Sequence, residues 1–152
     1  MKKLLLLVAL APMFAADPAG FVLWKSSDLK SYEKKLTPKM SDKKLATEQL
    51  VNFGNHSTMV AHREGDGEAE LHEKMADLFV VQSGEGTLVV GGTVPGGKTT
   101  APGEIRGPSI QGGEHKKLGP GDVVHIPANV PHQVLVAPGK QFTYFVMKVE
   151  AK

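Results

Sequence analysis

Two short stretches of this chain, residues 70–86 and 121–132, place acids and histidines at spacings that converge only if several β-strands fold around a common interior. Imidazole nitrogens and carboxylate oxygens bind metal ions and also act as acids and bases. The sequence therefore predicts a metal-binding or acid/base pocket. Its candidate residues are two acids and three histidines: Glu70, His72, Asp77, His125 and His132.

The first stretch has the alternation of a β-strand. Side chains of an extended strand point to opposite faces in turn, so Glu70 and His72 share one face. Asp77 begins the next alternating run and can face back toward His72. The glycines of residues 84–86, followed by the apolar residues 87–90, predict a β-hairpin.

The second stretch begins at a Gly-Pro-Gly-Asp turn, continues as a hydrophobic strand and is interrupted by Pro127. Asn129 and Pro131 suit a tight return, after which His132 opens the next strand. In a regular strand His125 shares a face with Pro127. We expect His125 to be either an acid/base group, because an imidazole titrates near neutral pH, or a hydrogen-bonded histidine of a half-buried strand.

Together, the two stretches resemble the two motifs of the cupin superfamily, whose small β-barrels hold a divalent metal. The first cupin motif is His, any residue, His, three or four residues, Glu, six residues and Gly, and its places are taken here by Glu70, His72, Asp77 and Gly84. The second motif is Gly, five residues, Pro, any residue, Gly, two residues and His, and its places are taken by Gly121, Pro127, Asn129 and His132. The resemblance covers about residues 57–149.

This resemblance implies an all-β fold, a jelly-roll β-barrel with a short N-terminal helical or extended arm, and a homodimer. It implies metal ligation by His72 and His132, with Asp77 where the family has Glu and Glu70 where it has its first His. The carboxylates make the site harder, which favours Fe(II), Mn(II) or Ni(II) over zinc, although zinc stays among the candidates.

We expect an exported single-domain cupin that binds a divalent metal and a small oxygen-rich molecule in the barrel, as a metal-dependent oxygenase or isomerase. Glu70 would be a fourth ligand or a base, and His125 an acid/base group. Because one fold hosts many functions, two alternatives stay open. One is a non-catalytic, metal-free protein that binds or senses a small molecule, and the other is a metal-free isomerase or epimerase.

The N-terminus is typical of a secretory signal peptide over residues 1–16, with two lysines, an apolar run and small residues before Asp17. Its apolar run is too short to span a bilayer, so we expect a periplasmic or secreted protein without a stable membrane span. Loss of Lys2 and Lys3 lowers the 18 basic residues to 16, equal to the 16 acidic ones. Nucleic-acid binding is therefore not expected, because it needs a basic face. The chain has no cysteine and no disulfide.

The remainder divides into an N-terminal arm, residues 17–44, and a cupin barrel domain, residues 45–152. In the arm, Ser27 and Asp28 predict the start of a short helix, which Pro38 ends. Residues 91–113 are rich in backbone breakers and predict a long loop. We expect this loop either to cover the barrel mouth, with Lys98, Glu104 or Arg106 touching substrate, or to be a surface connection.

Overall fold

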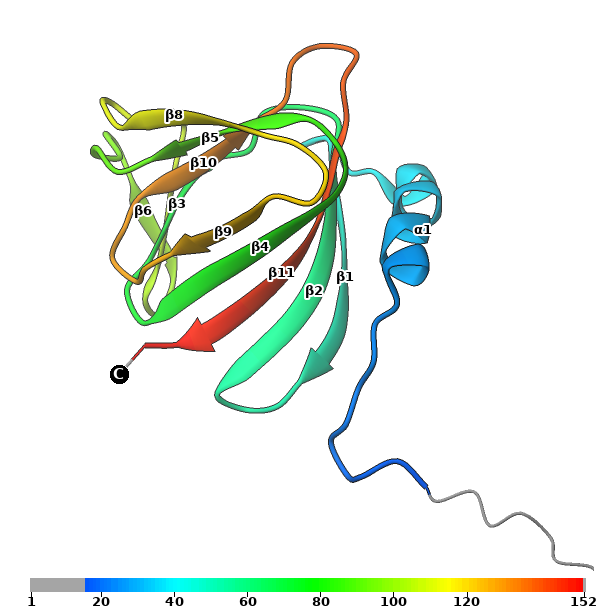
Figure 1. Cartoon of the computed structure of the whole chain (residues 1–152). Helices are drawn as coiled ribbons and strands as arrows, with labels where there is room; N and C mark the ends of the chain where they lie inside the picture. Colours follow the sequence, from blue (N-terminus) through cyan, green and yellow to red (C-terminus); the bar gives the residue numbers. More distant parts are fainter. Residues whose placement is uncertain (1–15, 152) are drawn as a thin grey trace, which may run out of the picture.

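A computed structural model describes residues 16–151 as a barrel of β-strands with a helix at its side (Figure 1). The elements in chain order are α1 (Ser26–Leu36), the 3-10 helix η1 (Thr37–Lys39), β1 (Leu45–Asn52), β2 (His56–Arg63), β3 (Ala69–His72), β4 (Met75–Gly84), β5 (Gly86–Val90), β6 (Lys98–Ala101), β7 (Glu104–Gly107), β8 (Glu114–Leu118), β9 (Val123–Ile126), β10 (His132–Leu135) and β11 (Phe142–Glu150).

The strands form two antiparallel sheets, one of five strands in the order β1-β2-β11-β4-β9 and one of six in the order β6-β7-β3-β10-β5-β8. The predicted all-β jelly-roll barrel is confirmed. Its core lies between the two sheets, where β11 contributes Phe142, Tyr144 and Val146 and the opposite sheet contributes Leu88 and Val134. The alternation of β11 therefore directs every second side chain into the barrel.

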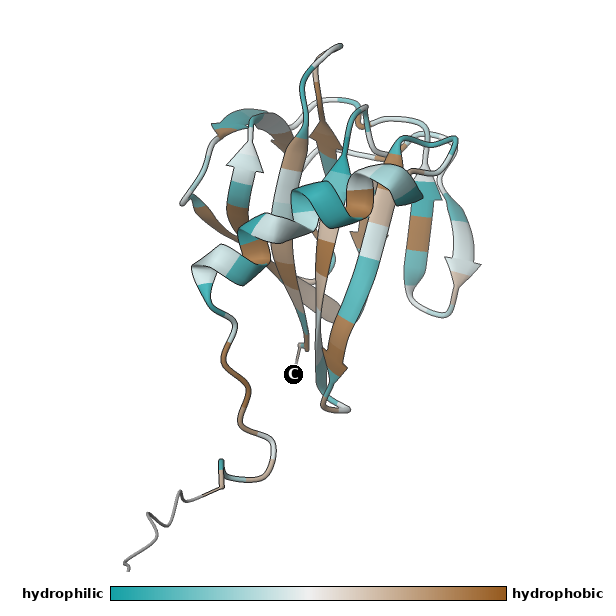
Figure 2. Ribbon diagram, turned by 90° about the vertical axis from the view of Figure 1, so that its right-hand side faces the viewer, coloured by the Kyte–Doolittle hydropathy of each residue, from teal (hydrophilic) through white to brown (hydrophobic). Residues whose placement is uncertain are grey.

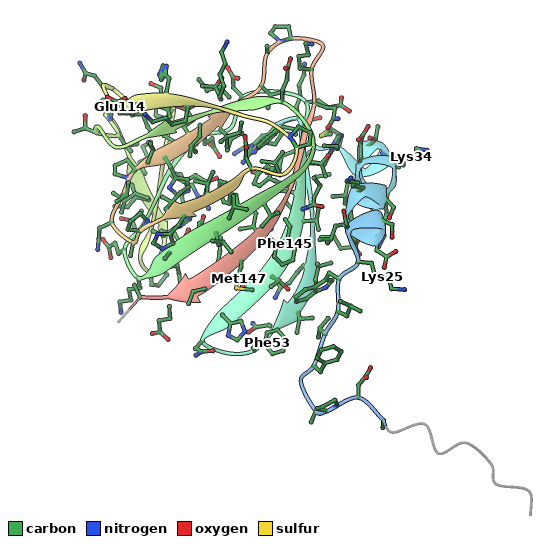
Figure 3. The ribbon with its side chains drawn as sticks, viewed as in Figure 1. Lys25, Lys34, Phe53, Glu114, Phe145 and Met147 are labelled. Atoms are coloured by element: carbon green, nitrogen blue, oxygen red, sulfur yellow. The ribbon has the colours of Figure 1, made fainter. Side chains whose placement is uncertain are left out.

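The outer face of the five-stranded sheet is covered by α1, which lies across the strands in Figure 2. Leu29 and Leu36 are buried in a second apolar cluster with Phe145 of β11. Phe145 and Met147 are labelled on this strand in Figure 3. The predicted helix is confirmed, but its expected N-terminal cap is not, because Lys25 is the N-cap residue and makes no side-chain capping hydrogen bond. Packing against the sheet stabilises this helix instead.

The predicted hairpin at residues 84–86 is wrong. Although β4 and β5 are separated only by Glu85, they belong to different sheets, so the chain crosses from one layer to the other at this point. Gly84 makes the crossing possible because its φ is +77°, and a Cβ there would overlap the backbone carbonyl oxygen of Gln141.

The predicted loop at residues 91–113 is also partly wrong. It contains β6 and β7, which pair with each other across a turn at Gly103, and β7 extends the six-stranded sheet by pairing with β3. Each strand has four residues, which is too short for a clear alternation in the sequence.

The predicted signal peptide lies, except for its last residue, outside the described residues. Within residues 16–151, no helix is long and apolar enough to cross a membrane. The first strand begins at Leu45, and the division into an arm and a barrel domain stays a prediction.

Candidate metal centre

Four predicted residues converge inside the barrel. Each of them offers one potential ligand atom, and these atoms all lie within 4.8 Å of one another. Oδ2 of Asp77 lies 3.3 Å from Nε2 of His72 and 3.5 Å from Nε2 of His132. Oε2 of Glu70 lies 3.5 Å and 3.7 Å from the same two nitrogens. The two stretches therefore build one cluster: Glu70, His72, Asp77 and His132.

Strand pairing explains the convergence. Glu70 on β3 is the direct partner of His132 on β10, so these residues meet on one wall of the barrel. Asp77 lies on β4 in the opposite sheet, and the cluster therefore joins the two walls. The turn before β10 is held by Asn129, whose backbone N–H donates to the carbonyl oxygen of His72 at 2.8 Å.

Both imidazoles are oriented for metal binding. Nδ1 of His72 lies 2.7 Å from Oε2 of Glu104, and Nδ1 of His132 lies 3.1 Å from the carbonyl oxygen of Val130. Each Nδ1–H then donates outward and each Nε2 lone pair faces the cluster, as in histidines that bind metal ions. Nε2 of His132 is buried and has no hydrogen-bond partner among the described residues. The Nε2 atoms of the two imidazoles, together with two carboxylates, suit a divalent ion.

A lysine from the C-terminal strand enters the same cluster. Nζ of Lys148 lies 2.8 Å from Nε2 of His72 and 3.0 Å and 3.1 Å from the two carboxylate oxygens of Asp77. An ammonium group only donates, so the contact with His72 is a hydrogen bond when Nε2 carries no proton. Proton, ammonium group and metal ion thus compete for one lone pair.

The buried acids and imidazoles shift one another's pKa values in the metal-free protein. Burial lowers the pKa of His72, but hydrogen bonds with Asp77 and Glu70 outweigh burial and raise it to about 9. Burial likewise opposes the charge of His132, and the same two carboxylates raise its pKa. Conversely, burial raises the pKa of Asp77 and Glu70, but their close contacts with the two imidazoles outweigh burial and lower it. Both carboxylates are therefore ionised at neutral pH.

Two arginines border the cluster on the side of Glu70. Arg106 forms an ion pair with Glu70 and lies 3.3 Å from the carboxylate of Glu104. Arg63 is buried, donates to the phenol oxygen of Tyr144 at 3.0 Å and lies 3.6 Å from Glu70. Guanidinium groups that cannot lose their protons therefore offset part of the negative charge of the cluster.

A cavity of about 890 Å³ opens beside the cluster. Its lining includes Glu70 and Asp77 from the cluster and apolar side chains such as Met59 and Val89. Of the three residues expected to touch substrate, Arg106 lines the cavity, Glu104 contacts His72, and Lys98 is exposed on β6. The cavity has the size and mixed lining of a small-molecule site.

His125 does not join the cluster. It pairs with Leu78, whereas its neighbour Ile126 pairs with Asp77 and is buried in the core. Because strand faces alternate, the exposed side chain of His125 points out of the barrel. The expected acid/base role of His125 therefore has no support from its position, and the alternative of a hydrogen-bonded histidine in a half-buried strand stays a prediction.

Lys148 was not predicted as a neighbour of the cluster, and Glu104 was expected to touch substrate rather than His72. Lys148 follows Phe142, Tyr144 and Val146 in the same alternation, and this period was a signal for an inward lysine. Glu104 carried no such signal, because it becomes a neighbour of His72 only through the pairing of β7 with β3.

Comparisons with solved structures agree with this architecture. A cupin-like protein from Thermotoga maritima aligns with 69% of this chain and 68% of its own at 19% identity and a TM-score of 0.51. The chain has the cupin fold. The DMSP lyase DddQ from Ruegeria pomeroyi shares it at 17% identity and a TM-score of 0.51, over 70% of this chain and 47% of the lyase.

The polyketide cyclase RemF from Streptomyces resistomycificus aligns at 17% identity and a TM-score of 0.50, over 70% of this chain and 66% of the cyclase. The chain thus spans about half of the lyase and two thirds of the cyclase. No protein-family model and no curated protein matches the sequence. The likeness concerns the fold, and function has to be argued from the site.

Proposed function

We propose that this cupin binds a divalent metal ion through Glu70, His72, Asp77 and His132 and takes a small oxygen-rich molecule in its cavity. The observation that carries the proposal is the orientation of the two imidazoles, whose Nδ1 atoms have partners outside the cluster while both Nε2 atoms face the carboxylates. Metal-binding histidines have this arrangement, with Nδ1–H bonded to a partner and Nε2 directed at the ion.

The donor set favours a hard or intermediate ion, namely Fe(II), Mn(II) or Ni(II), over Zn(II). Four protein donors leave positions open on a six-coordinate ion, where the metal would act as a Lewis acid or oxygen activator in an oxygenase or isomerase. Glu70 is the donor closest to the cavity arginines and is the candidate base if it does not ligate.

Charge balance supports an anionic ligand. Apart from the two imidazoles, the charged groups in direct contact with the cluster are three acids and three bases: Glu70, Asp77, Glu104, Arg63, Arg106 and Lys148. These charges cancel while both imidazoles are neutral, so a divalent ion adds two positive charges to a partly desolvated pocket. A ligand with carboxylate or enolate oxygens would compensate them and reach Arg106 at the cavity wall.

Metal content provides the test. Protein purified without a histidine tag is dialysed against a chelator and reloaded with Mn(II), Fe(II), Ni(II) or Zn(II), and bound metal is measured by mass spectrometry. We expect one ion per chain in the wild type and a sharp loss in His72→Ala and His132→Ala. His125→Ala is the matched control, because this exposed histidine should leave binding unchanged. Equal metal content in all four proteins would refute the proposal.

A metal-free binding or sensing protein is the second candidate, and Lys148 favours it. The ammonium group contacts Asp77 and His72 and supplies a positive charge within the cluster. The same dialysis experiment separates the candidates, since metal that does not return on reloading would support the metal-free protein.

We also propose export and homodimer formation. Export is supported by the N-terminal pattern of residues 1–16 and predicts a mature protein that begins close to Asp17, which mass measurement of the secreted or periplasmic form tests. The homodimer is supported only by the resemblance to cupins, and light scattering of the purified protein tests it.

A further inference from the structure

The ammonium group of Lys148 contacts the donor atoms that a metal ion would use. Its Nζ lies 2.8 Å from Nε2 of His72 and 3.0 Å from Oδ1 of Asp77. We propose that Lys148 is an internal competitor of the metal ion, so that the ion binds only after the ammonium group has left these atoms. This inference rests on the proposed metal-binding function.

The metal ion and the ammonium group of Lys148 cannot both lie at His72 and Asp77, because the two positions are too close together. Zn(II), one of the two ions in the test below, binds imidazole nitrogen and carboxylate oxygen at about 2.0–2.2 Å, so an ion that used both donors would lie between His72 and Asp77. The ammonium nitrogen already lies at hydrogen-bond distance from both residues. An ion bound there would face a positive charge only a few ångströms away, in a region where His72 and Asp77 are almost fully buried.

The side chain of Lys148 has room to withdraw. Its backbone is fixed between two strands, because Lys148 pairs with Asp77 on β4 and with Ser57 on β2. Its side chain lines the cavity and is 23% exposed, whereas that of Asp77 is 2% exposed. A flexible four-carbon stem can therefore swing the ammonium group toward the cavity while the backbone keeps its place.

The position of Lys148 would otherwise suit an apolar residue. The inward side chains before it on β11 are Phe142, Tyr144 and Val146, all of them buried. A lysine in this row costs desolvation energy, which its hydrogen bonds with Asp77 compensate. Lys148 thus neutralises the acidic cluster in the metal-free protein, and metal binding exchanges one cation for another.

Metal affinity of Lys148→Met tests the competition, because methionine keeps the length of the side chain and removes its charge. Lys140→Met is the matched control, since Lys140 forms an exposed ion pair with Glu85 at 3.0 Å, outside the cavity lining. After chelator treatment, Mn(II) and Zn(II) affinities are measured by competition with a chromophoric chelator. We expect at least tenfold tighter binding in Lys148→Met and an unchanged affinity in Lys140→Met.

Folding of each variant is verified by circular dichroism. Equal or weaker affinity in folded Lys148→Met would overturn the competition while leaving metal binding in place. If neither the wild type nor Lys148→Met binds either ion, the metal-binding function itself fails and this inference with it.

A second measurement needs only the wild type. Lysine acetylation, quantified by peptide mass spectrometry with and without Mn(II), reports how accessible each amine is. We expect metal to increase the labelling of Lys148 relative to Lys140, because displacement moves the amine toward the cavity. Unchanged labelling of Lys148 at saturating metal would mean that the ammonium group stays in place, and it would overturn the proposal.

Discussion

Oε2 of Glu104 lies 2.7 Å from Nδ1 of His72, and the two residues are direct partners in the pairing of β3 with β7. The carboxylate accepts the Nδ1–H hydrogen bond, which leaves the Nε2 lone pair directed into the cluster. Glu104 is thus a positioning residue for one of the two imidazole donors.

Glu104→Ala should therefore weaken metal binding although Glu104 is outside the group of four donors. We expect a loss of affinity of about tenfold to a hundredfold, the usual range for removing such a partner. Glu114→Ala is the matched control, because this glutamate is exposed on β8 and should leave the affinity unchanged. Titration with Mn(II) after chelator treatment measures the affinity of both variants. An unchanged affinity in Glu104→Ala would show that the hydrogen bond from His72 to Glu104 is not needed for metal binding.

Gly84 should be far less replaceable than Gly91, although both have φ near +80°. A Cβ at residue 84 meets the backbone oxygen of Gln141, whereas at residue 91 nothing lies within 4 Å. We expect Gly84→Ala to lower the free energy of unfolding by about 3 kcal/mol or more, because backbone must shift, and Gly91→Ala by only about 1 kcal/mol. Urea unfolding measures the difference, and equal effects would contradict the steric argument.

Much of the candidate site could be predicted from the sequence because its residues lie in two local patterns. Alternation places Glu70 and His72 on one face, and the turn at Asn129 places His132 at the start of a strand. Asn129 stands where the cupin motif has Gly, and its φ of +63° explains the match, since asparagine tolerates this region.

The rest depends on which strands become neighbours, and local patterns do not contain this information. Lys148 meets Asp77 through a pairing that joins residues 71 positions apart, and Glu104 meets His72 across 32 positions. The wrong hairpin at Gly84 has the same origin, because the sequence shows a turn but not whether the chain stays in one sheet.

The stability of the metal-free protein should fall as the pH rises from about 6.5 to about 9. The pKa of His72 is raised from 6.5 to about 9, so the folded state holds this proton more tightly than the unfolded chain does. That stabilisation is complete below pH 6.5 and is lost as the pH rises through 9. The expected decrease is about 3 kcal/mol, measured by urea unfolding at several pH values.

His72→Gln is the control for this pH dependence, because glutamine does not titrate in the range. Its unfolding free energy should change less between pH 6.5 and 9 than that of the wild type. An equally steep decrease in both proteins would assign the effect to another group.

Replacement of Asn129 by glycine should destabilise the protein less than replacement by alanine. Its side-chain amide donates to the carbonyl oxygen of Glu73 at 3.1 Å, a bond that both substitutions remove. Both substitutions keep the positive φ of +63°, but glycine adopts it freely, whereas for alanine it costs about 1 kcal/mol or more. We therefore expect Asn129→Ala to be less stable than Asn129→Gly by about this amount and to bind metal less tightly, because the turn positions His132. Urea unfolding and Mn(II) titration of the two variants measure both effects, and equal stability would mean that the turn relaxes to another conformation.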